Sequence, residues 1–163
     1  MSLRQQGIGA RPRGYTLIEL VLVIVIAGIL AAVAGPHFFD SGVFAQRGYA
    51  DALAAALRVA QKAAVATDCP AEVNLSSGAY SVQQQAASGN TCNPNDTSWS
   101  TPVVGPDGAA VAGTAPNNVS ASPAGLYVFS GSGALSSAPA TALTVGAATI
   151  TIDAQTGFVQ EVQ

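Results

Sequence analysis

The sequence predicts an α+β protein in which a long N-terminal helix, apolar at first and then amphipathic, precedes an antiparallel β-sheet head. Three features support this fold class. The stretch from Leu20 to Phe39 contains no Lys, Arg, Asp or Glu. Apolar residues then recur at three- and four-residue spacing up to about Thr67, as in an amphipathic helix. From Asp68 onward, short alternating runs are separated by Gly, Pro, Ser and Asn, which is typical of antiparallel strands and turns.

Composition narrows the classes of function. The 163 residues are 49% hydrophobic and 9% charged, with 6 Lys and Arg against 9 Asp and Glu and a formal net charge of −3. Half of the basic residues lie within the first 13 positions, so the remainder is acidic, which disfavours nucleic acid as a partner. One His and two distant Cys provide no cluster for a metal centre or a catalytic site. We therefore expect no enzyme activity, no cofactor and no metal.

The apolar stretch is predicted to cross a membrane, because it has the length of helix that spans a hydrocarbon layer of roughly 30 Å. Arginines precede it and the acids Asp40 and Asp51 follow it. The positive-inside rule then leaves the N-terminus in the cytoplasm and places the later residues across the membrane.

Three interpretations of this stretch compete. An ordinary secretory signal peptide would be cut at the small-residue site Ala32-Val33-Ala34, and a plain single-pass anchor would be retained. The signal peptide does not explain Glu19 at the start of the apolar run, because a charge inside a membrane helix costs about 2.5–3.5 kcal/mol on insertion scales. In a plain anchor, Glu19 would lie close enough to the interface for its carboxylate to reach the headgroups at reduced cost, but this interpretation gives no role to Gly14 or Pro36.

The third interpretation rests on the string Gly14-Tyr15-Thr16-Leu17-Ile18-Glu19-Leu20. This string resembles the processing site of type IV pilins and type II secretion pseudopilins. The resemblance implies that a prepilin peptidase and methyltransferase cuts after Gly14 and methylates the new amino terminus on Tyr15, where Phe is usual in the family. A glycine suits this step because it lets a protease approach the backbone closely. Residues 1–14 would then be a cleaved leader.

Cleavage would create a charged amine on Tyr15, one turn from the Glu19 carboxylate. In a filament core with little water, the amine of one subunit and Glu19 of its neighbour would attract strongly, whereas each alone is costly to bury. The resemblance implies this assembly role for Glu19. It also covers Gly35 and Pro36, since pilins have a helix-disrupting proline at this distance from the cut. We expect a kink or a melted stretch around Ala32–Pro36.

The helix is predicted to have a transmembrane half, residues 15–39, and an amphipathic half, residues 40–67. The apolar face of the second half should pack on the head and consists of Tyr49, Leu53, Leu57, Ala60 and Ala64. The charged face should be solvated and carries Arg47, Asp51, Arg58 and Lys62.

Five strands are predicted in the extracytoplasmic head, residues 68–163. Ala71–Leu75 and Ala79–Gln83 flank the turn residues Ser-Ser-Gly as a hairpin. Leu126–Phe129 has the pattern of a buried strand, and Thr149–Ile152 with Phe158–Val162 flanks a second turn.

Residues 86–119 are rich in Gly, Asn, Pro, Thr and Ser, and we expect them to form surface loops. Cys69 and Cys92 are expected to form a disulfide, because an extracytoplasmic head lies in an oxidising compartment.

Later segments resemble H-type minor pseudopilins and MSHA minor pilins of the MshC kind, namely residues 44–49, 56–63, 68–70, 149–152 and 156–159. The resemblance implies a minor subunit that starts or caps a filament of other pilins. An inner-membrane platform protein and an assembly ATPase would extract it from the bacterial inner membrane into a periplasmic or extracellular filament. An MSHA-type adhesive pilus and a type II secretion pseudopilus both stay open. DNA uptake is disfavoured because no Lys or Arg follows Lys62.

Overall fold

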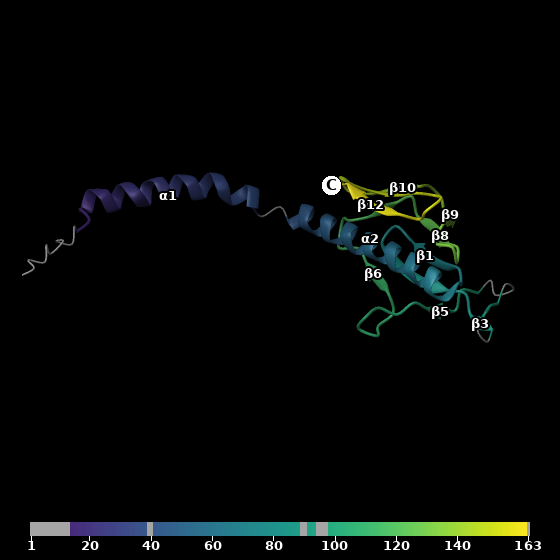
Figure 1. Cartoon of the computed structure of the whole chain (residues 1–163). Helices are drawn as coiled ribbons and strands as arrows, with labels where there is room; N and C mark the ends of the chain where they lie inside the picture. The colour runs from purple at the N-terminus through teal and green to yellow at the C-terminus, as the bar shows by residue number, and fades with distance from the viewer. Residues whose placement is uncertain (1–13, 39–40, 89–90, 94–97, 163) are drawn as a thin grey trace, which may run out of the picture. The chain divides into compact units, whose positions relative to one another are not determined.

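The computed structural model describes residues 14–38, 41–88, 91–93 and 98–162. The chain divides into two compact units, residues 1–40 and 41–163. The first contains the helix α1, Leu17–Phe38, and the second contains the helix α2, Ser41–Thr67, and all the strands (Figure 1).

The described side chains of α1 are exposed within this chain. The exposed fraction of its large apolar residues runs from 39% at Val21 to 80% at Leu17, and every buried core residue of the described chain belongs to the second unit. Among the helices that the structure describes, none is both long enough and apolar enough to cross a membrane. The predicted transmembrane half, residues 15–39, is therefore not confirmed.

The predicted apolar face of α2 is confirmed. Tyr49, Leu53, Leu57, Ala60 and Ala64 are all buried, with exposed fractions of 5% or less. The buried surface is wider than predicted, because α2 packs against strands of two different sheets (Figure 1).

The larger sheet has six strands in the order β5-β2-β1-β8-β9, with β6 also paired to β2, and all pairs are antiparallel. The predicted hairpin and the predicted buried strand lie at its centre as β1, β2 and β8. The strands are β1 Ala71–Leu75, β2 Ala79–Gln84, β5 Thr101–Pro102, β6 Ala112–Thr114, β8 Gly125–Phe129 and β9 Leu135–Ser137.

The smaller sheet has four antiparallel strands in the order β12-β11-β10-β7. Its β11–β12 pair is the second predicted hairpin, which is confirmed. The strands are β7 Ala121–Ser122, β10 Ala142–Val145, β11 Ala148–Ile152 and β12 Val159–Val162. A separate pair is formed by β3, Ala87–Ser88, and β4, Thr91–Cys92.

Residues 86–119 were expected to form surface loops, and no strands could be assigned to them from the sequence; in the structure they contain the short strands β3 to β6. β5 and β6 both add to the edge of β2. These strands have two or three residues each, which is too short for an alternating pattern to appear in the sequence. Gly113 of β6 lies opposite Tyr80, and a Cβ there would approach the tyrosine ring to 2.6 Å. The glycine therefore lets the ring lie against β6.

Arg58 is not solvated as predicted. It is half-buried, and its Nε donates a hydrogen bond to the carbonyl oxygen of Val159 in β12 at 3.3 Å. Arg47 and Lys62 are exposed, as expected. Arg58 therefore ties the helix to the four-stranded sheet, because guanidinium donors can satisfy a strand carbonyl that has no partner strand.

Glu72 in β1 gives a testable pH dependence. It is the one buried polar residue in the described part of the chain, its Oε2 has no hydrogen-bond partner, and its cross-strand neighbours Gln83 and Val128 are uncharged. Burial raises the pKa of its carboxyl. The folded state thus holds the proton more tightly than the unfolded state, so stability falls as pH rises from the unfolded pKa through the folded pKa.

We expect Glu72→Gln to raise the free energy of unfolding at pH 7 by about 1–2 kcal/mol, because it removes the charge from a buried carboxyl whose Oε2 has no hydrogen-bond partner. Urea unfolding at pH 7 and pH 4 measures this. Most of the gain should disappear at pH 4, because this pH lies below the ordinary pKa of a glutamate and the wild-type carboxyl is then largely protonated in both states. A gain of equal size at both pH values would contradict the interpretation that the ionised form of Glu72 destabilises the fold.

Candidate functional site: the start of the first helix

Residues 14–16 precede α1, and Thr16 caps it. The Oγ1 of Thr16 accepts a hydrogen bond from the backbone N–H of Glu19 at 3.3 Å, and its carbonyl accepts one from Leu20 at 3.2 Å. Thr-x-x-Glu is the sequence of a capping box, which satisfies amides at a helix start. The glutamate in the first turn also interacts favourably with the positive end of the helix dipole. Sequence reasoning missed the role of Thr16, although the Thr-x-x-Glu spacing signals it.

The predicted cleavage position is open in the structure. Among the residues that the structure describes, none has a heavy atom within 4 Å of a Cβ placed on Gly14, and the Tyr15 side chain is 82% exposed. A cut after Gly14 would leave the cap intact, because both hydrogen bonds to Thr16 come from residues after the cut. Any block caused by a bulkier residue at position 14 would therefore arise in the peptidase and not in the fold of this chain.

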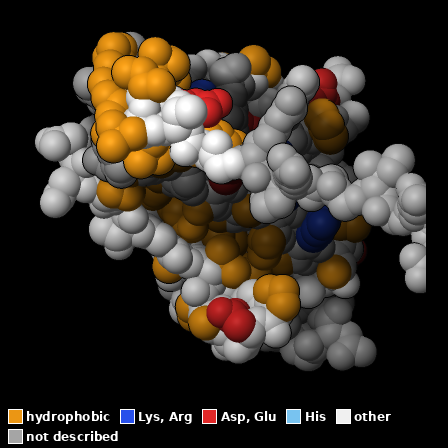
Figure 2. Space-filling view, turned by 90° about the vertical axis from the view of Figure 1, so that its left-hand side faces the viewer, with side chains coloured by type: hydrophobic (Ala, Val, Ile, Leu, Met, Phe, Trp, Pro, Cys, Tyr) orange, Lys and Arg blue, Asp and Glu red, His pale blue; other side chains and the backbone are white. Residues whose placement is uncertain are grey.

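Glu19 is exposed and has no cationic partner among the described residues of its own chain. The other side chains of its helix are apolar on all sides as far as Leu30, apart from small residues. A helix that is hydrophobic all round is normally buried. On the face of the molecule shown in Figure 2, hydrophobic side chains likewise outnumber charged ones.

The backbone of α1 stays helical across Gly35 and Pro36 and ends at Phe38. The expected melted stretch is therefore absent from the described backbone, and the kink at these two residues stays a prediction. The possible cut after Ala34 lies within this helical segment.

The disulfide between Cys69 and Cys92 is present, with its Cα atoms 5.3 Å apart. Local structure places Cys69 directly after α2. Asp68 adopts the left-handed conformation, with φ of 54°, and the N–H of Cys69 bonds back to the carbonyl of Ala64 at 3.2 Å. This is a Schellman-type helix end, in which aspartate replaces the usual glycine. The disulfide joins this helix end to β4.

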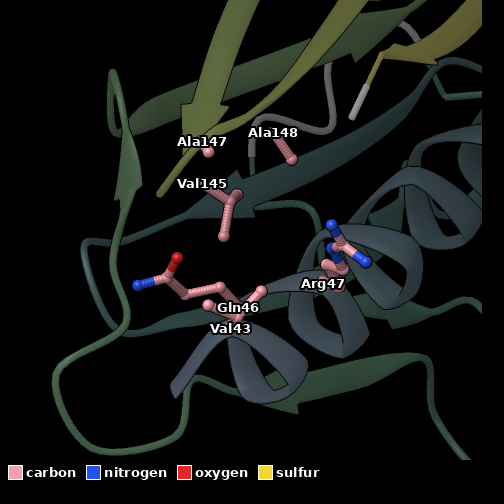
Figure 3. A pocket seen from close by; sticks show the side chains of 6 residues that line it. All are labelled: Val43, Gln46, Arg47, Val145, Ala147 and Ala148. Carbon is pink, nitrogen blue, oxygen red and sulfur yellow. The ribbon is translucent and has the colours of Figure 1, made fainter. Parts of the chain in front are cut away.

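A small cavity of about 90 Å³ lies between the first turns of α2 and the β10–β11 turn (Figure 3). Val145 points from β10 toward the helix, whereas Gln46 and Arg47 extend to opposite sides. Its volume is well below the ~300 Å³ at which small-molecule sites begin. We interpret it as a packing gap.

Comparison with known proteins locates the similarity at this end of the chain. Residues 10–35 match the family model described as the prokaryotic N-terminal methylation motif. The start of the chain is thus similar to that of type IV pilins. The chain is also 54% identical over 50 residues to the type IV narrow pilus major component PilA5 of Thermus thermophilus.

That match covers 31% of this chain and 43% of the relative, so less than half of the relative's length is spanned. No solved structure matches the chain. The matched motif, residues 10–35, includes Gly14, Tyr15 and Glu19.

Proposed function

We propose that this chain is a structural subunit of a type IV pilin-like filament and not an enzyme. The observation that carries the proposal is the exposed apolar helix that begins with the Thr16–Glu19 cap two residues after Gly14. The apolar side chains of such a helix must be buried against other apolar surface, and parallel helices of neighbouring subunits bury them. Small residues such as Ala27 and Gly28 allow two helices to approach each other closely.

In this proposal, a prepilin peptidase removes residues 1–14 and methylates Tyr15. The subunit is held in the bacterial inner membrane until a platform protein helps to transfer it into a periplasmic or extracellular filament of other pilins. Glu19 pairs with the amine of a neighbouring subunit. The absence of a cationic partner within the described residues of one copy supports this, because an isolated buried carboxylate would be costly.

A minor subunit of an MSHA-type pilus is the specific function that we favour, and a minor pseudopilin H of a type II secretion system is the alternative. The relative with 54% identity is described as a pilus component, which favours a pilus. Deletion of the gene should therefore remove surface pili and leave secretion of hydrolases unchanged. Loss of secretion with normal pili would select the pseudopilin.

The first experiment is the mass of the mature protein from its native host. We expect a chain that begins at N-methylated Tyr15. A chain that begins at Gly35 would indicate an ordinary signal peptide, and a chain that retains residues 1–14 would indicate a plain anchor. Either result would contradict the proposal.

The second experiment separates charge from capping at position 19. Glu19→Gln removes the charge but retains a residue that suits a capping box. We expect normal cleavage and loss of the subunit from sheared filaments. Asp107→Asn is the matched control, since it removes an exposed acid in a loop of the head. Normal incorporation of the Glu19→Gln subunit would exclude the proposed charge pairing.

A further inference from the structure

The outer face of the four-stranded sheet contains a depression of about 340 Å³. Its lining residues come from β10, β11, β12 and the adjoining turns, and all of them lie within the described residues: Thr141, Ala142, Thr151, Ile152, Asp153, Phe158 and Gln160. This volume is within the range of small-molecule sites, ~300–1,000 Å³. The depression lies in the head and is separate from the site at the start of α1.

Strand register forms the floor of the depression. Ala142, Thr151 and Gln160 are direct cross-strand neighbours on three adjacent strands. Their flanking residues Leu143, Ile150 and Val159 are buried, so the row itself faces away from the core. Because the side chain of Ala142 is small, the space above it stays open and forms the depression. Thr151 and Gln160 place a hydroxyl and an amide in this depression.

Phe158 supplies an aromatic wall, with 63% of its surface exposed. The backbone holds it there, because its carbonyl accepts a hydrogen bond from Asp153 at 2.9 Å and its N–H donates to the Oγ1 of Thr156 at 3.3 Å. With the backbone held at the rim of the hollow, only the two side-chain torsions of Phe158 must be ordered when its ring stacks on a flat apolar ligand face.

Asp153 supplies the one charge of the lining. Its Oδ1 accepts hydrogen bonds from the N–H groups of Gln155 and Thr156, at 3.1 and 2.7 Å, and from the Thr156 hydroxyl at 2.8 Å. Hydrogen bonds from the backbone and side chain of Thr156 lower the pKa of this carboxyl. Its Oδ2 takes part in none of these three bonds, so a fixed carboxylate presents an acceptor oxygen.

The side chains that line the depression indicate the chemical class of its ligand. The lining contains no Lys, Arg or His, so it does not favour phosphates, sulfates or acidic sugars. An aromatic face beside a carboxylate, hydroxyls and an amide matches a ring with an apolar C–H face and a rim of hydroxyls that both donate and accept. We propose that this depression binds a neutral saccharide of one or two hexose units.

In the proposed complex, the sugar stacks on Phe158, and Asp153 Oδ2 accepts hydrogen bonds from adjacent sugar hydroxyls. Thr151 and Gln160 contact the other edge of the ring. The site is shallow and a hexose has few heavy atoms, so the dissociation constant should be about millimolar. This inference does not depend on filament assembly.

Saturation-transfer NMR on the full-length chain tests the proposal, with methyl glycosides of glucose, galactose, mannose and N-acetylglucosamine as probes. The micelle should be a zwitterionic detergent, since a detergent with a sugar headgroup would compete. We expect saturation transfer to the C–H face of at least one glycoside. Phe158→Ala should weaken binding at least tenfold, and Asp153→Asn should weaken it several-fold.

Phe44→Ala is the matched control, because Phe44 is an equally exposed phenylalanine, at 66%, outside the depression. It should leave the signal unchanged. No transfer from any of the four glycosides, or an equal loss in both phenylalanine variants, would overturn the proposal. If the wild type binds no glycoside and the Phe158→Ala subunit enters filaments poorly, the proposal is also overturned. That pair of results would mean that this face of the sheet is a contact between subunits.

Discussion

Replacing both Cys69 and Cys92 with alanine is expected to lower the free energy of unfolding of the head by about 3–4 kcal/mol. The disulfide closes a loop between residues 23 positions apart, and an open chain has more unfolded conformations to lose on folding. Alanine is preferable to serine because Cys69 is 3% exposed, and a buried hydroxyl would add a cost of its own.

The measurement is urea unfolding of the full-length chain in detergent, followed by the fluorescence of its one tryptophan, Trp99. The free energy of unfolding of the reduced wild type should equal that of the double variant. Reductant should not change the free energy of unfolding of the double variant. Equal stability of oxidised and reduced wild type would show that the disulfide does not constrain the unfolded head.

Gly157→Ala is expected to lower the same free energy by about 2–4 kcal/mol. Gly157 has a φ of 67°, which an L-residue with a Cβ rarely adopts, and the new Cβ would lie 2.0 Å from the carbonyl oxygen of Gly133. It would also lie 2.8 Å from Nε2 of Gln61. That amide donates to the carbonyl oxygens of Thr156 and Gly133, at 2.7 and 3.4 Å, and so joins two loops to α2.

Gly78→Ala is the control for this substitution. Gly78 lies in the β1–β2 turn without a positive φ, and no heavy atom lies within 4 Å of a Cβ placed there. Its replacement should change stability by no more than about 0.5 kcal/mol. A similar loss in both variants would mean that the junction of Gly157, Gly133 and Gln61 contributes little.

The elements that sequence reasoning predicted have strong local signals. β1 and β2 flank a short turn of Ser and Gly, and β11 and β12 flank another turn, so alternation and turn chemistry agree. β7 was beyond such reasoning, because it has two residues and pairs with β10 some twenty positions later. β10 was missed although its four residues alternate between exposed and buried and a two-residue turn with Gly146 joins it to β11. The division into two sheets follows from that long-range pairing and not from a local pattern.

Side-chain environments were predicted less well than elements. Glu72 is an outward position of β1, where alternation suggests a solvated side chain, yet tertiary packing buries it. The environment of Arg58 likewise depends on the position of β12, because its hydrogen-bond acceptor is the carbonyl oxygen of Val159 in that strand. At the candidate site, the motif from Gly14 to Glu19 is readable from the sequence, but the proposed partner of Glu19 is the amine of another copy, which a single chain does not contain.

The position of α2 determines how the head bears a mechanical load. The chain enters the head through this helix, which packs against strands of both sheets and is also held in its C-terminal part by Arg58, Gln61 and the disulfide that follows its last turn. A pull applied at residue 41 therefore shears the helix past both sheets at once, and its side-chain contacts resist together. Peeling one strand from an edge would break bonds one by one at far lower force. The head is thus built to withstand tension that arrives from its N-terminal end.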